Sequence, residues 1–157
     1  MGSGKSTVGK LLSVYLGWDF IDVDKVIEER EGMKIRDIFK KKGEDYFRNV
    51  EMKTLKNLLK YNKKVIATGG GLGANEKAMK LMKEKGIVVW LDIPYEEFLR
   101  RCKKDGSRPL LQKRTEELKD IFEKRKKIYE KAHIRIDACQ SPAKVMESII
   151  DKLPWKG

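Results

Sequence analysis

The fold is decided by the stretch GSGKST at residues 2–7, directly after Met1. It matches the second half of the pattern Gly-x-x-x-x-Gly-Lys-Ser/Thr, in which backbone amides surround phosphate oxygens, the lysine reaches the outer phosphates and the hydroxyl binds Mg²⁺. Val8, Leu11, Leu12 and Tyr15 follow at helical spacing, so the loop opens a helix whose positive amino end attracts phosphate. The alternative is an ordinary Gly-Ser turn before a helix.

A loop of this kind normally follows a buried strand, as in the strand, loop and helix unit of nucleotide-binding folds. Here the first Gly of the pattern would lie two residues before Met1, with the strand before it. We therefore interpret the sequence as one that starts late, at an internal Met, or that has been shortened. Without that strand we expect poor stability, and an inactive chain is an alternative to an active one.

Short β-branched runs alternate with amphipathic segments of helix length, which is typical of a parallel sheet covered by helices. The expected helices span 5–16, about 25–60 in two or three pieces, 115–132 and 142–153, and the expected strands span 19–22, 65–68, 87–92 and 133–137. The continuous apolar run at 87–92 indicates a strand buried on both faces. The sequence thus predicts an α/β protein.

With 157 residues the chain has the size of one compact domain, 1–157. Its net charge of +12 makes anionic ligands plausible, but the basic runs are interleaved with Asp and Glu along predicted helices, so we expect no nucleic acid partner. Two cysteines are too few for a disulfide framework, and no apolar run reaches the roughly 18 residues of a membrane span. We expect a cytoplasmic monomer without membrane attachment.

Two carboxylates, Asp22 and Asp24, lie at the end of the first predicted strand. Side chains two residues apart on a strand point to the same side, and ligands of open α/β folds bind at the carboxyl ends of the strands. One carboxylate can hold Mg²⁺ through water, and the other can orient or deprotonate an attacking hydroxyl. Asp24 could instead cap a helix that begins at Lys25, or do both.

Three consecutive glycines, Gly69, Gly70 and Gly71, follow the second predicted strand. Because each glycine costs backbone entropy, the run favours a place where a small substrate or a transferred phosphate lies against the main chain. With Ala74 and Asp92 the run also fits a loose dinucleotide-binding fingerprint. A plain loop is the simplest alternative.

Two arginines occupy predicted apolar helix faces. Arg125 falls in the apolar stripe of the helix at 115–132, and Arg48 heads an apolar row with Glu51 one turn away. An inward guanidinium needs an anion, and a carboxylate can accept from it bidentately, so the pair predicts a site for a small acid. An internal salt bridge to Glu51 or Asp24 is the alternative.

Arg108 lies in the polar stretch 103–115, which contains Gly106 and Pro109 and predicts a mobile lid. An arginine that closes over the phosphates would stabilise the charge that develops in phosphoryl transfer. An exposed loop arginine without such a role is the alternative.

Taken in chain order, the segments MGSGKST, FIDVD, EDYFRNVE, TGGGLG, SRPLL and EKRKKIYEKA resemble the shikimate kinase family, a branch of the P-loop kinases related to nucleoside monophosphate kinases. The resemblance covers essentially the whole chain. It implies a three-layer fold in which a parallel sheet of strand order 2-3-1-4-5 is flanked by helices, with the first, central strand absent from this chain. The helices at about 25–60 would then bind the acceptor substrate.

The resemblance also implies roles for individual residues. ATP would be bound by Gly2, Ser3, Gly4, Lys5, Ser6, Thr7, Arg101, Arg108 and Gln140, and Mg²⁺ by Ser6 and Asp22. Shikimate would be bound by Asp24, Arg48, Gly69, Gly70, Gly71 and Arg125. Asp24, Lys5 and Arg108 would act in the transfer of the ATP γ-phosphate to the 3-hydroxyl of shikimate, a step towards chorismate and the aromatic amino acids. The family often has a basic residue at the position of Gln140.

A related kinase acting on gluconate or a nucleoside monophosphate is the nearest alternative. The paired inward arginines with Asp24 favour a compact alcohol that carries a carboxylate. A basic nucleic-acid-binding module that keeps a phosphate loop is a second alternative. The sequence lacks the recognition helix, the aromatic platform and the concentrated basic stripe that such a module uses.

Overall fold

The computed structural model describes residues 4–104 and 115–154. The predicted site residues Gly2, Ser3 and Arg108 and most of the predicted lid at 103–115 lie outside these ranges. The described helices are α1 (Lys5–Leu16), α2 (Val23–Glu31), α3 (Ile35–Lys42), α4 (Glu44–Leu58), α5 (Gly70–Gly73), α6 (Glu76–Lys85), α7 (Tyr95–Lys104), α8 (Thr115–Tyr129) and α9 (Pro142–Lys152). The strands are β1 (Asp19–Asp22), β2 (Lys64–Ala67), β3 (Val89–Asp92) and β4 (Ile134–Asp137).

Helix α1 spans the predicted residues and lies between two glycines. Gly4 precedes it with a φ of 79° and Gly17 follows it with a φ of 69°, left-handed conformations that glycine adopts without steric cost. The amide of Gly17 donates to the carbonyls of Ser13 and Val14 and closes the helix. No described side chain caps the amino end of α1 or adds an acidic group to its first turn, so this end suits an anion.

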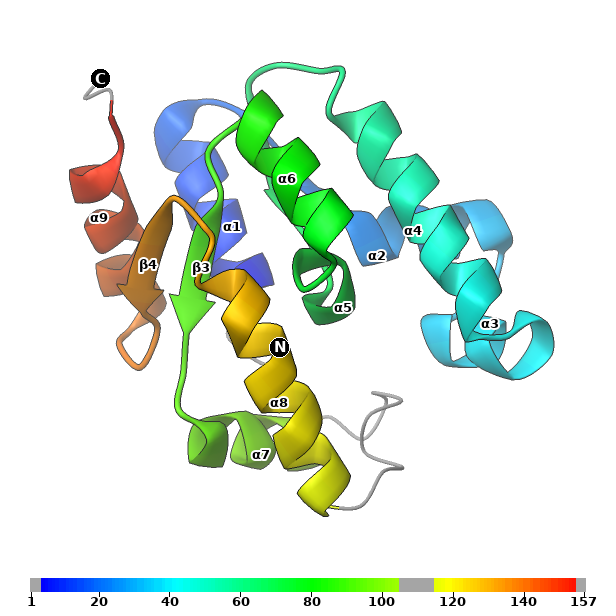
Figure 1. The fold of residues 1–157 in the computed structure, drawn as a ribbon. Coiled ribbons are helices and arrows are strands. Elements are labelled where there is room, and N and C mark those ends of the chain that lie inside the picture. The colour runs from blue at the N-terminus through cyan, green and yellow to red at the C-terminus, as the bar shows by residue number, and fades with distance from the viewer. Residues whose placement is uncertain (1–3, 105–114, 155–157) are drawn as a thin grey trace.

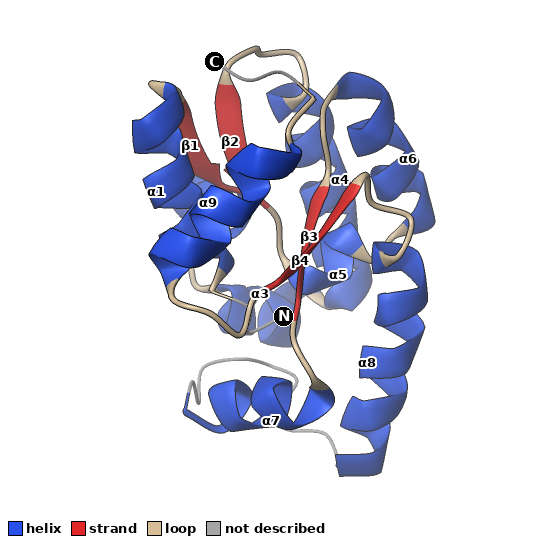
Figure 2. Ribbon diagram, turned by 90° about the vertical axis from the view of Figure 1, so that its left-hand side faces the viewer, coloured by secondary structure: helices blue, strands red, loops and turns tan. Residues whose placement is uncertain are grey.

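The four described strands form two parallel pairs, β1 with β2 and β3 with β4 (Figure 2). Asp19 lies opposite Lys64 in the first pair, and Val89 lies opposite Ile134 in the second. In both pairs, helices connect one strand to the next, as parallel pairing requires. The expected order 2-3-1-4-5 counts one strand before β1, so β1–β4 correspond to its strands 2–5. In that order strand 2 lies beside strand 3 and strand 4 beside strand 5, which agrees with the observed pairing.

Helices cover the strands on two sides, with α1 and α9 on one side and α5 and α6 on the other (Figures 1 and 2). Helices α1 and α9 pack around a cluster formed with β4, which consists of Val8, Leu12, Ile134, Ile136, Val145, Ile149 and Leu153. A second cluster joins α2 to α6 through Val23, Ile27, Ile38, Phe47, Leu55, Leu72, Ala78, Met79 and Met82. The predicted three-layer α/β architecture is confirmed.

A cavity of about 490 Å³ lies between β2 and β3. Its apolar lining includes Val8, Leu12, Val65, Ile66, Val89 and Leu91. The residues of β3 are only half-buried, so the expectation that 87–92 is buried on both faces is not met. The reason is this slot, because β2 and β3 each pair on one edge only within the described chain. The slot lies where a further strand could run between β2 and β3, and its lining is largely apolar.

Three helices fill the segment predicted as helical at about 25–60, and Gly32 and Gly43 separate them at φ values of 67° and 88°. Helix α2 begins two residues before Lys25, at Val23, because Asp22 is its N-cap. The Asp22 carboxylate accepts hydrogen bonds from the amides of Asp24, at 3.0 Å, and Lys25, at 3.4 Å. The alternative in which Asp24 caps this helix is therefore wrong.

Near the carboxyl end of the chain, α9 begins at Pro142, the predicted start. Ser141 is its N-cap, and Pro142 lies in the first turn. Helix α8 ends at Tyr129, three residues before the predicted end at 132. Across the described residues, no helix combines the length and the apolar character that a bilayer crossing needs.

The slot between β2 and β3 predicts that an added strand would stabilise the protein. An extension of about ten residues before Met1, containing a five-residue apolar strand, can pair with both edges and cover their side chains. We expect Tm to rise by about 10 °C, which corresponds to a few kcal/mol for a chain of this size. Thermal unfolding followed by circular dichroism measures the change.

The matched control is an extension of the same length with a proline at the centre of the strand, because proline cannot donate to a ladder inside a sheet. We expect this control to melt close to the original chain. If both extensions melt at the temperature of the original chain, the slot does not accept a strand.

Candidate active site

The amino end of α1 and the carboxyl end of β1 meet at a polar contact. The Ser6 hydroxyl donates to Oδ2 of Asp22 at 3.1 Å, while Oδ1 of Asp22 caps α2. Lys5 is half-buried at the same helix end, and Thr7 is exposed. A lysine, a hydroxyl and a carboxylate thus surround a helix amino end, which favours binding of phosphate groups.

The same hard oxygen donors suit Mg²⁺, which is commonly held by one or two protein groups together with phosphates and water. Ser6 and Asp22 supply the protein oxygens here. No group of three or more His, Cys, Asp or Glu side chains in the described part of the chain could hold a metal by itself. A divalent ion at this place therefore needs additional ligands from a bound nucleotide or from water.

Asp24 lies in the first turn of α2, against the glycine turn at 69–71. Strand β1 ends at Asp22, so the two aspartates belong to different elements rather than to one strand as predicted. A Cβ added at Gly69 would lie 3.1 Å from Oδ1 of Asp24 and 3.5 Å from Oε2 of Glu51. Two acidic side chains therefore face the same short piece of backbone, and a larger residue at position 69 would require the Asp24 carboxylate to shift.

Glu51 is the buried acid of this group, with an exposed fraction of 2%. Nη1 of Arg48 donates to its Oε1 at 2.7 Å. Burial raises the pKa of Glu51, and the charge of Arg48 offsets part of this effect. The internal salt bridge that the sequence left as an alternative for Arg48 is therefore present.

Arg48 also reaches the glycine turn and the solvent. Its Nη2 donates to Glu44 at 3.4 Å, and 33% of its side chain remains exposed. A Cβ at Gly71 would collide with the Arg48 guanidinium, so only glycine fits there without rearrangement. Because Arg48 is not fully enclosed by protein groups, an incoming anion can still reach it.

Arg125 approaches the same region from α8, and its side chain is half-buried. Burial lowers the pKa of Arg125, and the positive charge of Arg48 lowers it further, whereas Tyr129, Glu51 and Glu44 oppose the shift. The two guanidinium groups are therefore near enough to repel each other. A carboxylate bound between them would relieve this repulsion.

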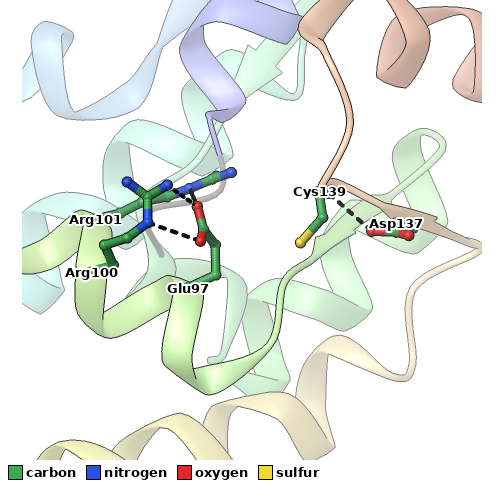
Figure 3. A network of polar contacts seen from close by, with 5 residues as sticks. All are labelled: Glu97, Arg100, Arg101, Asp137 and Cys139. Atoms are coloured by element: carbon green, nitrogen blue, oxygen red, sulfur yellow. Dashed lines mark hydrogen bonds and ion pairs between the residues drawn. The ribbon is translucent and has the colours of Figure 1, made fainter.

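Arg101 lies on the other side of the phosphate loop. A Cβ added at Gly4 would be 4.0 Å from its Nη1, and its Nε donates to Oε1 of Glu97 at 2.8 Å. Glu97 also accepts from Arg100, and these two arginines hold the pKa of Glu97 at about 2. Figure 3 shows this cluster facing Cys139 at the end of β4. Arg101 is thus placed beside the loop, as expected for a nucleotide contact.

Gln140, the neighbour of Cys139, is exposed, and its side-chain amide donates to the carbonyl of Asp137 at 2.9 Å. This bond keeps the amide within its own loop. The alternative dinucleotide fingerprint also loses support, because Asp92 accepts from Nε of Arg135 at 2.8 Å. The acidic group of that fingerprint is therefore engaged in a salt bridge.

A continuous series of contacts joins Ser6, Asp22, Asp24, Gly69, Glu51, Arg48 and Gly71. The amino end of α1 and the region around Arg48 are therefore connected through neighbouring residues. Sequence reasoning did not single out Glu97, although its spacing of four residues before Arg101 on a helix is a usable signal. It did not single out Tyr129 either.

Comparison with known proteins supports one assignment. The family model described as shikimate kinase matches residues 1–154. The shikimate kinase of Persephonella marina is 51% identical over 154 residues, which cover 98% of this chain and 94% of that protein.

Solved structures agree with this match. The crystal structure of shikimate kinase from Aquifex aeolicus superposes with a TM-score of 0.88 at 51% identity, covering 95% of this chain and 89% of that one. The enzyme from Acinetobacter baumannii, solved in complex with shikimate, gives a TM-score of 0.88 at 36% identity over 99% of this chain and 91% of that one. Sequence and fold thus agree over almost the whole length, and the chain belongs to the shikimate kinase family of P-loop kinases.

Proposed function

We propose that this chain transfers the γ-phosphate of ATP to the 3-hydroxyl of shikimate. The observation that carries the proposal is the contact series from Ser6 through Asp22 and Asp24 to Glu51 and Arg48. It links a site for phosphates to a site for a small carboxylic acid. Family membership supports both the reaction and the acceptor.

The nucleotide would bind at the amino end of α1. Lys5 would contact the outer phosphates, and the backbone around Gly4 would surround them, with Gly2, Ser3 and Thr7 completing the loop. Arg101 would lie beside the nucleotide, with Gln140 near its base. Mg²⁺, held by Ser6 and Asp22 together with phosphate oxygens, would supply neutralisation of phosphate charge.

The acceptor would bind on the other side of Asp24. Arg48 and Arg125 would take its carboxylate, because two guanidinium groups that repel each other gain from a shared anion. The backbone of Gly69, Gly70 and Gly71 would lie along the ring, where a side chain would collide with Asp24 or Arg48. This arrangement favours a compact acid over a larger nucleotide.

Asp24 would orient the attacking hydroxyl and accept its proton as the bond to phosphorus forms. Lys5 would stabilise the charge on the transferred group, and Arg108 would add a second positive charge from the predicted lid. The chain's contribution is therefore mostly positioning and charge neutralisation, which is typical of phosphoryl transfer.

The direct test is a phosphorylation assay with shikimate, gluconate and adenosine monophosphate as acceptors, with ³¹P NMR to identify the product. We expect shikimate 3-phosphate and no significant turnover of the other two. The strand-extended form described above is assayed in parallel, so that instability of the chain is separated from a wrong assignment. Turnover of gluconate or adenosine monophosphate in preference to shikimate would contradict the proposal.

Arg125→Ala should weaken shikimate binding by about a hundredfold, because it removes a charge-assisted pair of hydrogen bonds to the carboxylate. ATP binding should change by less than about twofold, since Arg125 acts on the acceptor side. Arg125→Lys should recover only part of the affinity, because an ammonium cannot bind bidentately. Isothermal titration calorimetry measures both ligands.

The control for this variant is Arg30→Ala, which removes an exposed arginine from the last turn of α2. It should leave both affinities unchanged. Equal shikimate affinity in Arg125→Ala and the parent protein would remove Arg125 from the proposed site.

Arg48 has a second effect, on stability, through Glu51. The folded-state pKa of Glu51 lies above its usual value, so the folded protein holds that proton more tightly than the unfolded chain does. The free energy of unfolding therefore falls as the pH rises from the pKa of Glu51 in the unfolded chain through its higher pKa in the folded protein. Arg48 limits this loss, because its charge favours the ionised carboxylate.

Arg48→Ala should raise the pKa of Glu51 further, so that the loss of folding stability continues to higher pH. We expect the Tm difference between Arg48→Ala and the parent protein to grow as the pH rises above the usual pKa of a glutamate. In a Glu51→Gln background, where no carboxylate titrates at this position, the Tm difference caused by Arg48→Ala should no longer grow with pH. Thermal melts across the pH range give the measurement, and a Tm difference that is constant with pH would show that Arg48 does not stabilise ionised Glu51.

A further inference from the structure

The glycine turn at 69–71 is held by its neighbours, because it has no side chains of its own. Asp24 and Glu51 lie against Gly69, and Arg48 lies against Gly71. At Gly70 the contact is of a different kind. The Tyr129 hydroxyl donates to the Gly70 carbonyl at 2.6 Å, across a separation of 59 residues in the sequence.

The Gly70 carbonyl accepts two hydrogen bonds. The second comes from the amide of Ala74, at 3.1 Å, and belongs to the short helix α5. A carbonyl oxygen has two lone pairs, so both bonds can form together. The Tyr129 hydroxyl is thus a tertiary restraint, added to the local one, on the peptide group between Gly70 and Gly71.

The ring of Tyr129 is also closely packed. A Cβ added at Gly73 would lie 3.3 Å from Cε1 of Tyr129, and the ring centroid lies 6.1 Å from that of Trp90. Burial raises the pKa of Tyr129 to about 12, and the neighbouring Arg125 offsets only part of this effect. The hydroxyl therefore stays protonated at physiological pH and acts as a donor to Gly70.

Tyr129 lies one helical turn after Arg125 on α8. The helix that carries the proposed carboxylate-binding arginine is thus bonded directly to the turn proposed to line the substrate ring. We infer that Tyr129 is a positioning residue for the acceptor substrate, which keeps Arg125 and the Gly69–Gly71 backbone in a fixed relative position. This inference rests on the proposed function, and it assigns Tyr129 no direct contact with substrate.

The test is Tyr129→Phe, which removes the hydroxyl and keeps the packed ring. We expect KM for shikimate to rise about tenfold, the size of effect that follows loss of one hydrogen bond to a buried acceptor. KM for ATP should stay within about twofold, because the Tyr129 hydroxyl donates to the glycine turn on the acceptor side. A residue that served stability alone would not separate the two KM values.

A second readout does not depend on catalysis. Hydrogen exchange of the amide of Ala74, in the protein without ligands, should become faster in Tyr129→Phe, since its acceptor loses one of its two restraints. The matched control is Tyr46→Phe. The Tyr46 hydroxyl donates to Glu31 at 2.8 Å, between α4 and α2 and apart from the glycine turn. It should change neither the shikimate KM nor the exchange of Ala74.

An unchanged shikimate KM, an equal rise in both KM values or unchanged exchange at Ala74 in Tyr129→Phe would each overturn the inference. The parent protein's own turnover of shikimate tests the proposed function separately. A parent without that activity contradicts the function, whereas an active parent with an insensitive Tyr129→Phe variant contradicts only the role of Tyr129.

Discussion

The site depends on the carboxylate of Asp22. One of its oxygens accepts from the Ser6 hydroxyl at the start of α1, and the other accepts from the amides that open α2. A single side chain therefore fixes the amino ends of two helices relative to each other. Because Asp24 follows in the first turn of α2, the same carboxylate sets the distance between the proposed phosphate site and the group that would orient the acceptor. Its proposed use as a magnesium ligand is compatible with this structural role.

On the acceptor side, the charges of two arginines and the lack of side chains at the glycine turn together shape the proposed binding site. Arg48 is paired with the buried Glu51, while Arg125 is half-buried close to a second positive charge. The glycines at 69 and 71 leave the space that Asp24 and Arg48 occupy. A small anion would therefore meet guanidinium groups that are already held in place, so little ordering would be needed on binding.

Several features could be predicted from local sequence because local physics determines them. The glycines around α1, the stops at Gly32 and Gly43 and the cap at Ser141 are of this kind. Helical periodicity placed Arg48 and Arg125 on predicted apolar faces, and both side chains are half-buried. The true N-cap of α2 was missed, since Asp22 and Asp24 both suit that position and only the end of β1 distinguishes them.

The hydrogen bond from Tyr129 to Gly70 could not be predicted, because periodicity shows which face of a helix is buried and not which distant carbonyl lies there. The half-burial of β3 depends on the slot beside it, which is a tertiary property.

The central claim is that phosphate at the start of α1 and a carboxylate between Arg48 and Arg125 are bound at the same time, on either side of Asp24. A crystal structure of the protein with ADP and shikimate tests this claim most directly. The account predicts ADP phosphates at Lys5 and Ser6, the shikimate carboxylate at both guanidinium groups and its 3-hydroxyl at Asp24. A shikimate molecule bound elsewhere, with Arg48 and Arg125 contacting only protein groups, would contradict it.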